Sequence, residues 1–102
     1  MFNVSQFEEF ILTPTLSLLQ KYSRDAVELL IFTCAAESNG GTFIRQIEGP
    51  ALGIYQMEPA THQDIFINYI HKNSSLMSIL GLNFQCNGFI DAERMVYDIR
   101  YA

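Results

Sequence analysis

Glu37 is the residue of this sequence whose type and position are best suited to chemistry. It follows a mostly apolar run, Ala26 to Ala36, and an Asn39-Gly40-Gly41 turn comes soon after it. Partial desolvation and the negative end of a helix dipole both favour the neutral carboxylic acid at such a position. An acid that keeps its proton near neutral pH can protonate a leaving oxygen, which glycoside cleavage requires. Taken alone, however, the residue is more simply explained as an exposed glutamate in a last helical turn.

A second group of residues, from Ala51 to Thr61, changes this assessment. Together with the run Ala35-Ala36-Glu37-Ser38 it resembles the lytic transglycosylase family of the lysozyme-like superfamily. The pattern of that family is Glu-Ser, a short loop, then Gly-Leu-Met-Gln, two residues, Pro, a small residue and Thr. Gly53 and Gln56 fall on its glycine and glutamine, and nineteen positions separate Gln56 from Glu37, close to the family's spacing. The second group is most similar to bacteriophage members.

The resemblance implies roles for five residues. Glu37 becomes the single acid/base catalyst. The implied substrate-binding residues are Ser38, Gly53, Tyr55 and Gln56. The amide of Gln56 offers both a donor and an acceptor to an N-acetyl group, and a glycine lets the chain lie close to a sugar.

The reaction implied by the resemblance cleaves the β-1,4 bond between N-acetylmuramic acid and N-acetylglucosamine in peptidoglycan. The glutamate protonates the glycosidic oxygen, and the N-acetyl carbonyl serves as internal nucleophile. The deprotonated glutamate then takes a proton from the muramyl 6-hydroxyl, which closes a 1,6-anhydro ring. The implied partners are the glycan strand and, for a phage protein, other virion proteins.

Departures from the family pattern keep other functions open. Tyr55 and Glu58 stand where methionines are usual, and the family's later Tyr-Asn-Ala-Gly motif does not occur in this sequence. A second carboxylate near the site repels a substrate anion or supplies a base for ordinary hydrolysis. The alternatives are therefore a hydrolytic muramidase, a non-catalytic phage virion or wall-binding module that keeps the fold, and a plain helical interaction domain.

The elements that must position these residues are mainly helices. We expect a mainly α, lysozyme-like α+β fold in which a short β-hairpin or an irregular loop, over residues 42–57, lies over the end of the catalytic helix. The N-terminal helix is expected to begin at Asn3, with Gln6 completing a capping box. It can restart at Thr13-Pro14, with Thr13 as its N-cap.

The helix that carries Glu37 is expected to begin after Ser23, a good N-cap, and to end near Glu37 or Ser38. Because it is apolar on nearly every side, the pattern predicts a central core helix. Three further helices are expected: one from about Pro59, one from Leu76 to Leu80 that Gly81 ends, and a last one capped by Asp91. The first should bury Ile65, Phe66, Tyr69 and Ile70, and in the last Met95, Val96, Ile99 and Ala102 share a face. The last pattern has no stop signal, so either the helix frays at Ala102 or the sequence is a C-terminally incomplete piece of something longer.

Composition narrows the class of protein. The chain has 102 residues, enough for one domain over 1–102, and 49% of them are hydrophobic, typical of a globular fold. The net charge of −5 and the scattered basic residues argue against binding to nucleic acid. The N-terminus lacks the features of a signal peptide and no apolar stretch is long enough to span a membrane. We therefore expect cytoplasmic synthesis without a signal peptide and action at the bacterial cell wall.

Cysteines and histidines give no strong signal. Cys34 lies in an apolar run, so a buried free thiol is expected rather than a bridge with Cys86. His62 and His71 have no partner ligands at metal-binding spacing, so solvated or capping histidines are expected. The sequence predicts neither a metal site nor a cofactor.

Overall fold

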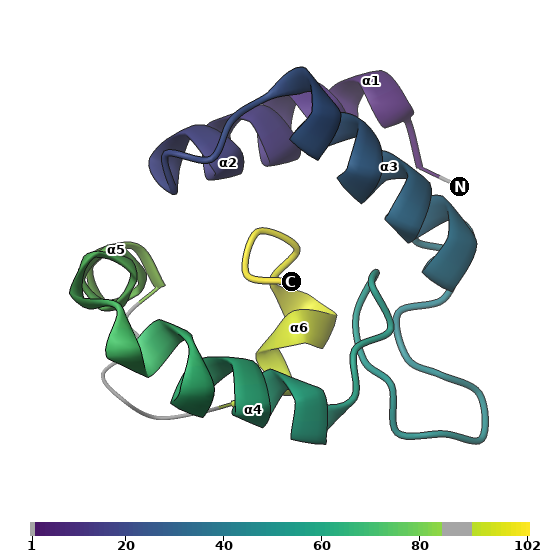
Figure 1. Ribbon diagram of the computed structural model, residues 1–102. Helices are drawn as coiled ribbons and strands as arrows, with labels where there is room; N and C mark the ends of the chain where they lie inside the picture. Colours follow the sequence, from purple (N-terminus) through teal and green to yellow (C-terminus); the bar gives the residue numbers. More distant parts are fainter. Residues whose placement is uncertain (1, 85–90) are drawn as a thin grey trace.

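The computed structural model describes residues 2–84 and 91–102, and this part of the chain is mainly helical, as expected (Figure 1). Two short pieces are not α-helical: a π-helical segment over Glu8–Leu12 and a 3-10 turn over Ile70–Lys72. The α-helices are α1 (Val4–Phe7), α2 (Thr13–Leu18), α3 (Arg24–Ser38), α4 (Pro59–Asn68), α5 (Ser74–Phe84) and α6 (Arg94–Tyr97).

The N-terminal helix runs without interruption from α1 through the π-helical segment into α2. Its predicted cap is confirmed, because the Asn3 side chain accepts a hydrogen bond from the Gln6 N–H at 3.0 Å. The predicted restart is found in part, because α2 begins at Thr13 with Pro14 in its first turn. Thr13 is not an N-cap, however, since it has helical angles (φ −60°, ψ −50°) and its N–H donates to the Glu8 carbonyl, five residues back. We attribute this wide turn to Pro14, whose ring clashes with the carbonyl four residues earlier in a regular α-helix.

The bounds of α3 agree with the prediction. The Ser23 hydroxyl accepts from the Ala26 N–H at 3.0 Å, and Asn39 ends the helix in the left-handed conformation. The predicted burial on all sides is wrong, since Leu29 and Phe32 are 65% and 70% exposed. The described part of the structure covers only one face of α3, the one that carries Val27 and Cys34. The Cys34 thiol is free and buried, as expected, whereas Cys86 lies outside the described residues.

The loop between α3 and α4 is the irregular alternative of the prediction, with no strand in its described residues. Leu52 is its centre, forming one isolated antiparallel bridge with Arg45 and another with Met57. The Leu52 and Met57 backbones exchange two hydrogen bonds of 2.9 and 3.0 Å. These bridges fold the loop back on itself beside the C-terminal end of α3.

The remaining helices follow the prediction in part. α4 begins at Pro59 as expected and buries Phe66, but Tyr69 is exposed. The expected stop at Gly81 is wrong, because α5 continues to Phe84. A glycine inside a helix costs only about 1 kcal/mol, and burial of Phe84 outweighs that cost.

The last predicted helix is only a single turn, α6. The predicted cap by Asp91 is wrong, because Glu93 is the N-cap of α6 and makes no side-chain capping bond. The Asp91 carboxylate instead accepts from the Glu93 N–H at 3.1 Å, in the turn before the helix. Ile99 and Ala102 follow α6 in a turn, so the predicted helical face from Met95 to Ala102 is not formed.

Two groups of buried side chains form the core. The first joins the N-terminal helix, α3 and the loop: Phe7, Leu12, Leu16, Val27, Cys34 and Ile54. The second consists of Phe66 from α4 and Phe84 from α5, with Tyr101 packed against them. In Figure 1 the C-terminal segment with α6 lies between the upper helices and the α4–α5 pair. Among the described residues, no helix is both long and apolar enough to cross a membrane.

Candidate functional site

Two of the predicted site residues, Glu37 and Gln56, line one open cavity of about 410 Å³. The end of α3 and the folded loop form its walls. Its lining residues are Glu37, Phe43, Gln46, Ile47, Ala51, Gln56 and Glu58. The spacing between the two motifs therefore brings the candidate acid and the candidate amide to one place.

Glu37 is exposed in the last turn of α3. Partial burial, expected from the apolar sequence around it, is not found. Asn39 and Gly40 donate their N–H groups to the carbonyls of Ala35 and Cys34, which ends the helix directly after the acid. Within the described structure the Glu37 carboxylate has no hydrogen bond or ion pair and is free to meet a ligand.

Gln56 is held in a strained turn. Its φ of 49° lies in the left-handed region, which is costly for a residue other than glycine. Its backbone N–H and its Nε2 both donate to the Gly53 carbonyl, at 3.0 and 2.8 Å. The amide oxygen and the second amide hydrogen have no partner among the described residues, so the side chain can offer an acceptor and a donor to a ligand.

Gly53 positions Gln56 instead of lining the cavity. It is buried, has a φ of 76°, and a Cβ added to it would lie 2.5 Å from the Met95 carbonyl oxygen. Its own N–H donates to the Ile44 carbonyl at 2.8 Å. The motif glycine is thus required here by the close approach of α6 and by the turn that carries Gln56.

Ser38 lies beneath the surface, with no exposed area. Its hydroxyl donates to the Cys34 carbonyl and accepts from the Gly41 N–H, both at 3.1 Å. The structure thus gives Ser38 a part in holding the turn after Glu37, with no side-chain surface exposed for a ligand to touch.

Tyr55 points into the first core group, away from the cavity. Its hydroxyl is buried without a hydrogen-bond partner in the described structure, and this burial raises the pKa of the phenol above its usual value, with a smaller contribution from Cys34. The structure does not bring Tyr55 together with Glu37 and Gln56.

Three lining residues were not predicted: Phe43, Gln46 and Ile47. Phe43 and Ile47 are exposed and supply the apolar part of the wall. The Gln46 side chain accepts from the Ala51 N–H at 3.0 Å, which ties the two sides of the loop together. The sequence carries no signal that would single out Phe43 and Ile47 from the other apolar residues of this loop.

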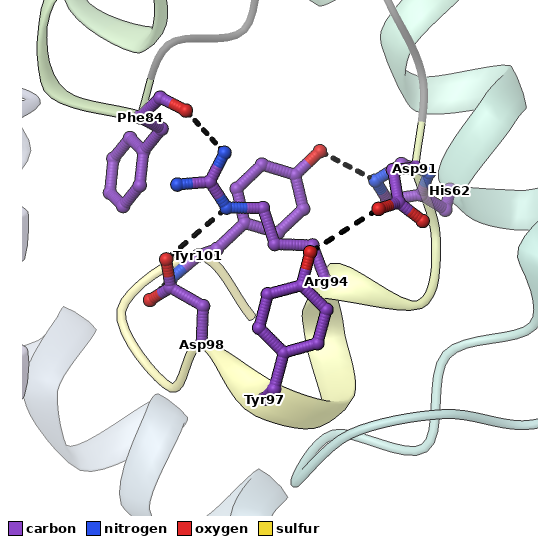
Figure 2. A network of polar contacts seen from close by, with 7 residues as sticks. All are labelled: His62, Phe84, Asp91, Arg94, Tyr97, Asp98 and Tyr101. Carbon is purple, nitrogen blue, oxygen red and sulfur yellow. Dashed lines mark hydrogen bonds and ion pairs between the residues drawn. The ribbon is translucent and has the colours of Figure 1, made fainter.

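A separate polar network joins the C-terminal segment to α4 and α5 (Figure 2). His62 Nε2 and the Tyr101 hydroxyl form a hydrogen bond of 2.8 Å. The Arg94 guanidinium lies over the Phe84 and Tyr101 rings, bonds to the Phe84 carbonyl and pairs with Asp98 at 3.2 Å. This network lies outside the cavity and supports α6, which in turn contacts Gly53.

The expectation of a solvated His62 is wrong, since the residue is 7% exposed and its Nδ1 has no partner within the described chain. Burial lowers the pKa of His62, and the Asp91 carboxylate opposes this effect. Over residues 2–84 and 91–102, no group of three or more His, Cys, Asp or Glu side chains is arranged to hold a metal ion.

Comparison of the chain with protein-family models, with curated proteins and with solved structures finds no match. Inference about its function thus depends on the residues of the cavity and on the two motifs that meet there.

Proposed function

We propose that this chain is a lytic-transglycosylase-like domain of lysozyme-like fold, which binds the glycan strand of peptidoglycan. Glu37 donates the proton to the glycosidic oxygen between N-acetylmuramic acid and N-acetylglucosamine. The observation that carries this proposal is that Glu37 and Gln56, each from one motif, line the same cavity. We also propose action at the bacterial cell wall, with phage virion proteins as partners, because the second motif is most similar to bacteriophage members.

The chemistry of the cavity supports a glycan ligand. The unused oxygen and amide hydrogen of Gln56 match the N–H and carbonyl of an acetamido group. Phe43 and Ile47 offer apolar surface to the faces of sugar rings. Glu37, exposed at the C-terminal end of α3, has no hydrogen-bond or ion-pair partner among the described residues, so its carboxyl group is free to approach a glycosidic oxygen.

The test is digestion of purified peptidoglycan, followed by loss of turbidity and by mass analysis of the released muropeptides. The wild-type protein is expected to release disaccharide products, and Glu37→Gln to reduce the rate at least about 100-fold, as loss of a general acid does. Glu48→Gln is the matched control, because Glu48 is an exposed glutamate of the same loop that does not line the cavity. Equal product from wild type and Glu37→Gln, or no product from wild type, contradicts the proposal.

The second candidate function is glycan binding without turnover. It is favoured by the open position of Glu37, because no hydrogen-bond partner among the described residues orients the exposed carboxyl group toward a glycosidic bond. Titration calorimetry with chito-oligosaccharides separates the two functions. Binding that Gln56→Ala weakens, together with intact substrate after long incubation, supports the wall-binding module, whereas turnover excludes it.

A further inference from the structure

Two carboxyl groups line the candidate cavity from opposite kinds of helix end. Glu37 lies in the last turn of α3, and Glu58 is the residue immediately before Pro59, which begins α4. The partial charge of a helix is negative at its C-terminal end and positive at its N-terminal end. Glu37 and Glu58 thus line one cavity at helix ends of opposite partial charge.

The Glu58 carboxylate is not used by the fold. Its backbone is extended (φ −71°, ψ 145°), and its side chain makes no capping hydrogen bond to α4. It is exposed and has no ion-pair partner in the part of the chain that the structure describes. Of the basic residues near the loop, Arg45 is already paired with both Glu93 oxygens, at 3.1 and 2.6 Å. No cation lines the described cavity, so Glu58 remains available to a ligand or a water.

Two carboxyl groups that line one cavity, each without a partner among the described residues, can serve as an acid and a base. We infer that Glu58 is a second catalytic residue, the base that activates a water, so that the glycan strand is cleaved by hydrolysis. This inference rests on the proposed function, and it concerns only the step that follows or accompanies departure of the leaving oxygen. Water takes the place of the muramyl 6-hydroxyl as the group that attacks the sugar.

The reaction balances with water as the only co-reactant. The water oxygen bonds to C1 of the muramic acid while Glu58 takes one of its protons. The bond between C1 and the glycosidic oxygen breaks, its electron pair stays on that oxygen, and Glu37 supplies the proton. The products are one reducing end and one free 4-hydroxyl, and proton return from Glu58 to Glu37 through solvent restores both groups.

The experiment is digestion of peptidoglycan in ¹⁸O-labelled water, followed by mass analysis of muropeptides after immediate borohydride reduction. The wild-type protein is expected to yield reducing ends that carry one ¹⁸O. Glu58→Gln is expected to lower the rate of formation of these labelled ends about 100-fold or more, while circular dichroism shows an unchanged fold. Glu48→Gln, the matched control, is expected to retain the wild-type rate and label.

The outcomes separate the two levels of the proposal. Cleavage by the wild-type protein that yields only 1,6-anhydro ends overturns the role of Glu58 and leaves the proposed function standing. Labelled ends formed by Glu58→Gln at the wild-type rate also overturn that role. If the wild-type protein cleaves nothing, the proposed function fails, and the role of Glu58 fails with it.

Discussion

Gln56 combines a strained backbone with an unused amide at the wall of the cavity. Strain of this kind persists where the surrounding structure enforces it, and it is frequent at functional sites. The turn that starts at Gly53 enforces it here through two hydrogen bonds to one carbonyl. A residue kept for stability alone would be expected to be glycine, which adopts this conformation without cost.

Gln56→Gly is therefore expected to separate stability from binding. The change relieves about 1 kcal/mol of backbone strain and removes one hydrogen bond worth about 1 kcal/mol, so the free energy of unfolding should change little. Gln56→Ala loses the bond and keeps the strain, and should be less stable than the glycine variant by about 1 kcal/mol. Urea denaturation measures both changes, while glycan affinity should fall in both variants. If the alanine variant is as stable as the glycine variant, the left-handed backbone at position 56 is not strained in solution.

Gly53→Ala is expected to be more damaging than a change at the nearby Gly49. The new Cβ at Gly53 meets a backbone atom, the Met95 carbonyl oxygen, at a φ of 76°. At Gly49 the nearest atoms belong to the flexible end of the Gln46 side chain, which can move. We expect a loss above about 2 kcal/mol for Gly53→Ala and about 1 kcal/mol for Gly49→Ala in urea unfolding. Similar losses would show that α6 does not hold the Gly53 turn in solution.

The sequence could predict that Glu37 and Gln56 share a cavity, but it could predict neither the other lining residues nor the direction of each motif side chain. The motif spacing indicated that Glu37 and Gln56 belong together, and both line the cavity. Ser38 and Tyr55 belong to the same motifs, yet the first supports a turn and the second fills the core. Their directions depend on where α3 ends and on how α6 packs against Gly53, which are tertiary contacts that local spacing does not contain.

Among the elements, the link between α4 and the segment after α6 makes stability depend on pH. His62 in the folded state has a pKa below its ordinary value of 6.5, because burial outweighs the attraction of Asp91. Below pH 6.5 the His62 side chain of the unfolded chain takes up a proton more readily than that of the folded chain. The stability contributed by neutral His62 is therefore complete above pH 6.5 and is lost as the pH falls from 6.5 toward the folded pKa.

This dependence is measured by urea unfolding at about pH 7 and about pH 5.5. The wild-type free energy of unfolding is expected to be smaller at the lower pH. In His62→Gln this difference between the two pH values should shrink by the share that His62 contributes. His71→Gln is the control, because it removes an exposed imidazole and leaves the bond to Tyr101 intact. The hydrogen bond from Arg45 lowers the pKa of Glu93 below 4.5, so any stability that this ion pair contributes is lost only at a more acidic pH than the range tested. If the pH dependence of stability is the same in His62→Gln as in wild type, then titration of His62 is not its cause.

Helix ends that depend on a local cap were predictable from sequence, and those that depend on burial were not. Asn3 and Ser23 accept the hydrogen bonds expected of N-caps, and the left-handed Asn39 ends α3 as expected. Gly81 resembles a stop signal, but α5 continues because Phe84 packs against Phe66. Pro14 lies in the first turn of α2 as expected, but a wide turn precedes α2 in place of a break, since the neighbouring backbone could shift its hydrogen bonds by one residue.

At the scale of the whole molecule, the outer face of α3 leaves large apolar side chains uncovered in the described structure. Phe32→Gln is expected to change the free energy of unfolding by less than about 0.5 kcal/mol, because the ring is already 70% exposed. Val27→Ala, on the buried face of the same helix, is expected to cost about 2 kcal/mol. Thermal and urea unfolding give both values. A cost for Phe32→Gln equal to that of Val27→Ala would mean that this face is covered in solution.

The mainly helical class was predictable from the periodicity of the apolar residues, whereas the division of the core was not. The run from Ala26 to Ala36 suggested one central helix, but the molecule extends 34 × 33 × 19 Å and spreads its buried side chains over two groups. A flat molecule of this size gives each helix only one covered face, and hydrophobicity alone does not reveal which face that is.

Tyr101 and Ala102 are neighbours in the chain, yet Tyr101 packs against the second core group and Ala102 against the first. Neither group can open fully without pulling on a residue whose neighbour is anchored in the other. Slowly exchanging amide hydrogens of α3 and of α4 should therefore report one common opening energy, as members of a single cooperative unit. Tyr101→Ala should split that unit, so that the amides of α4 exchange sooner than those of α3.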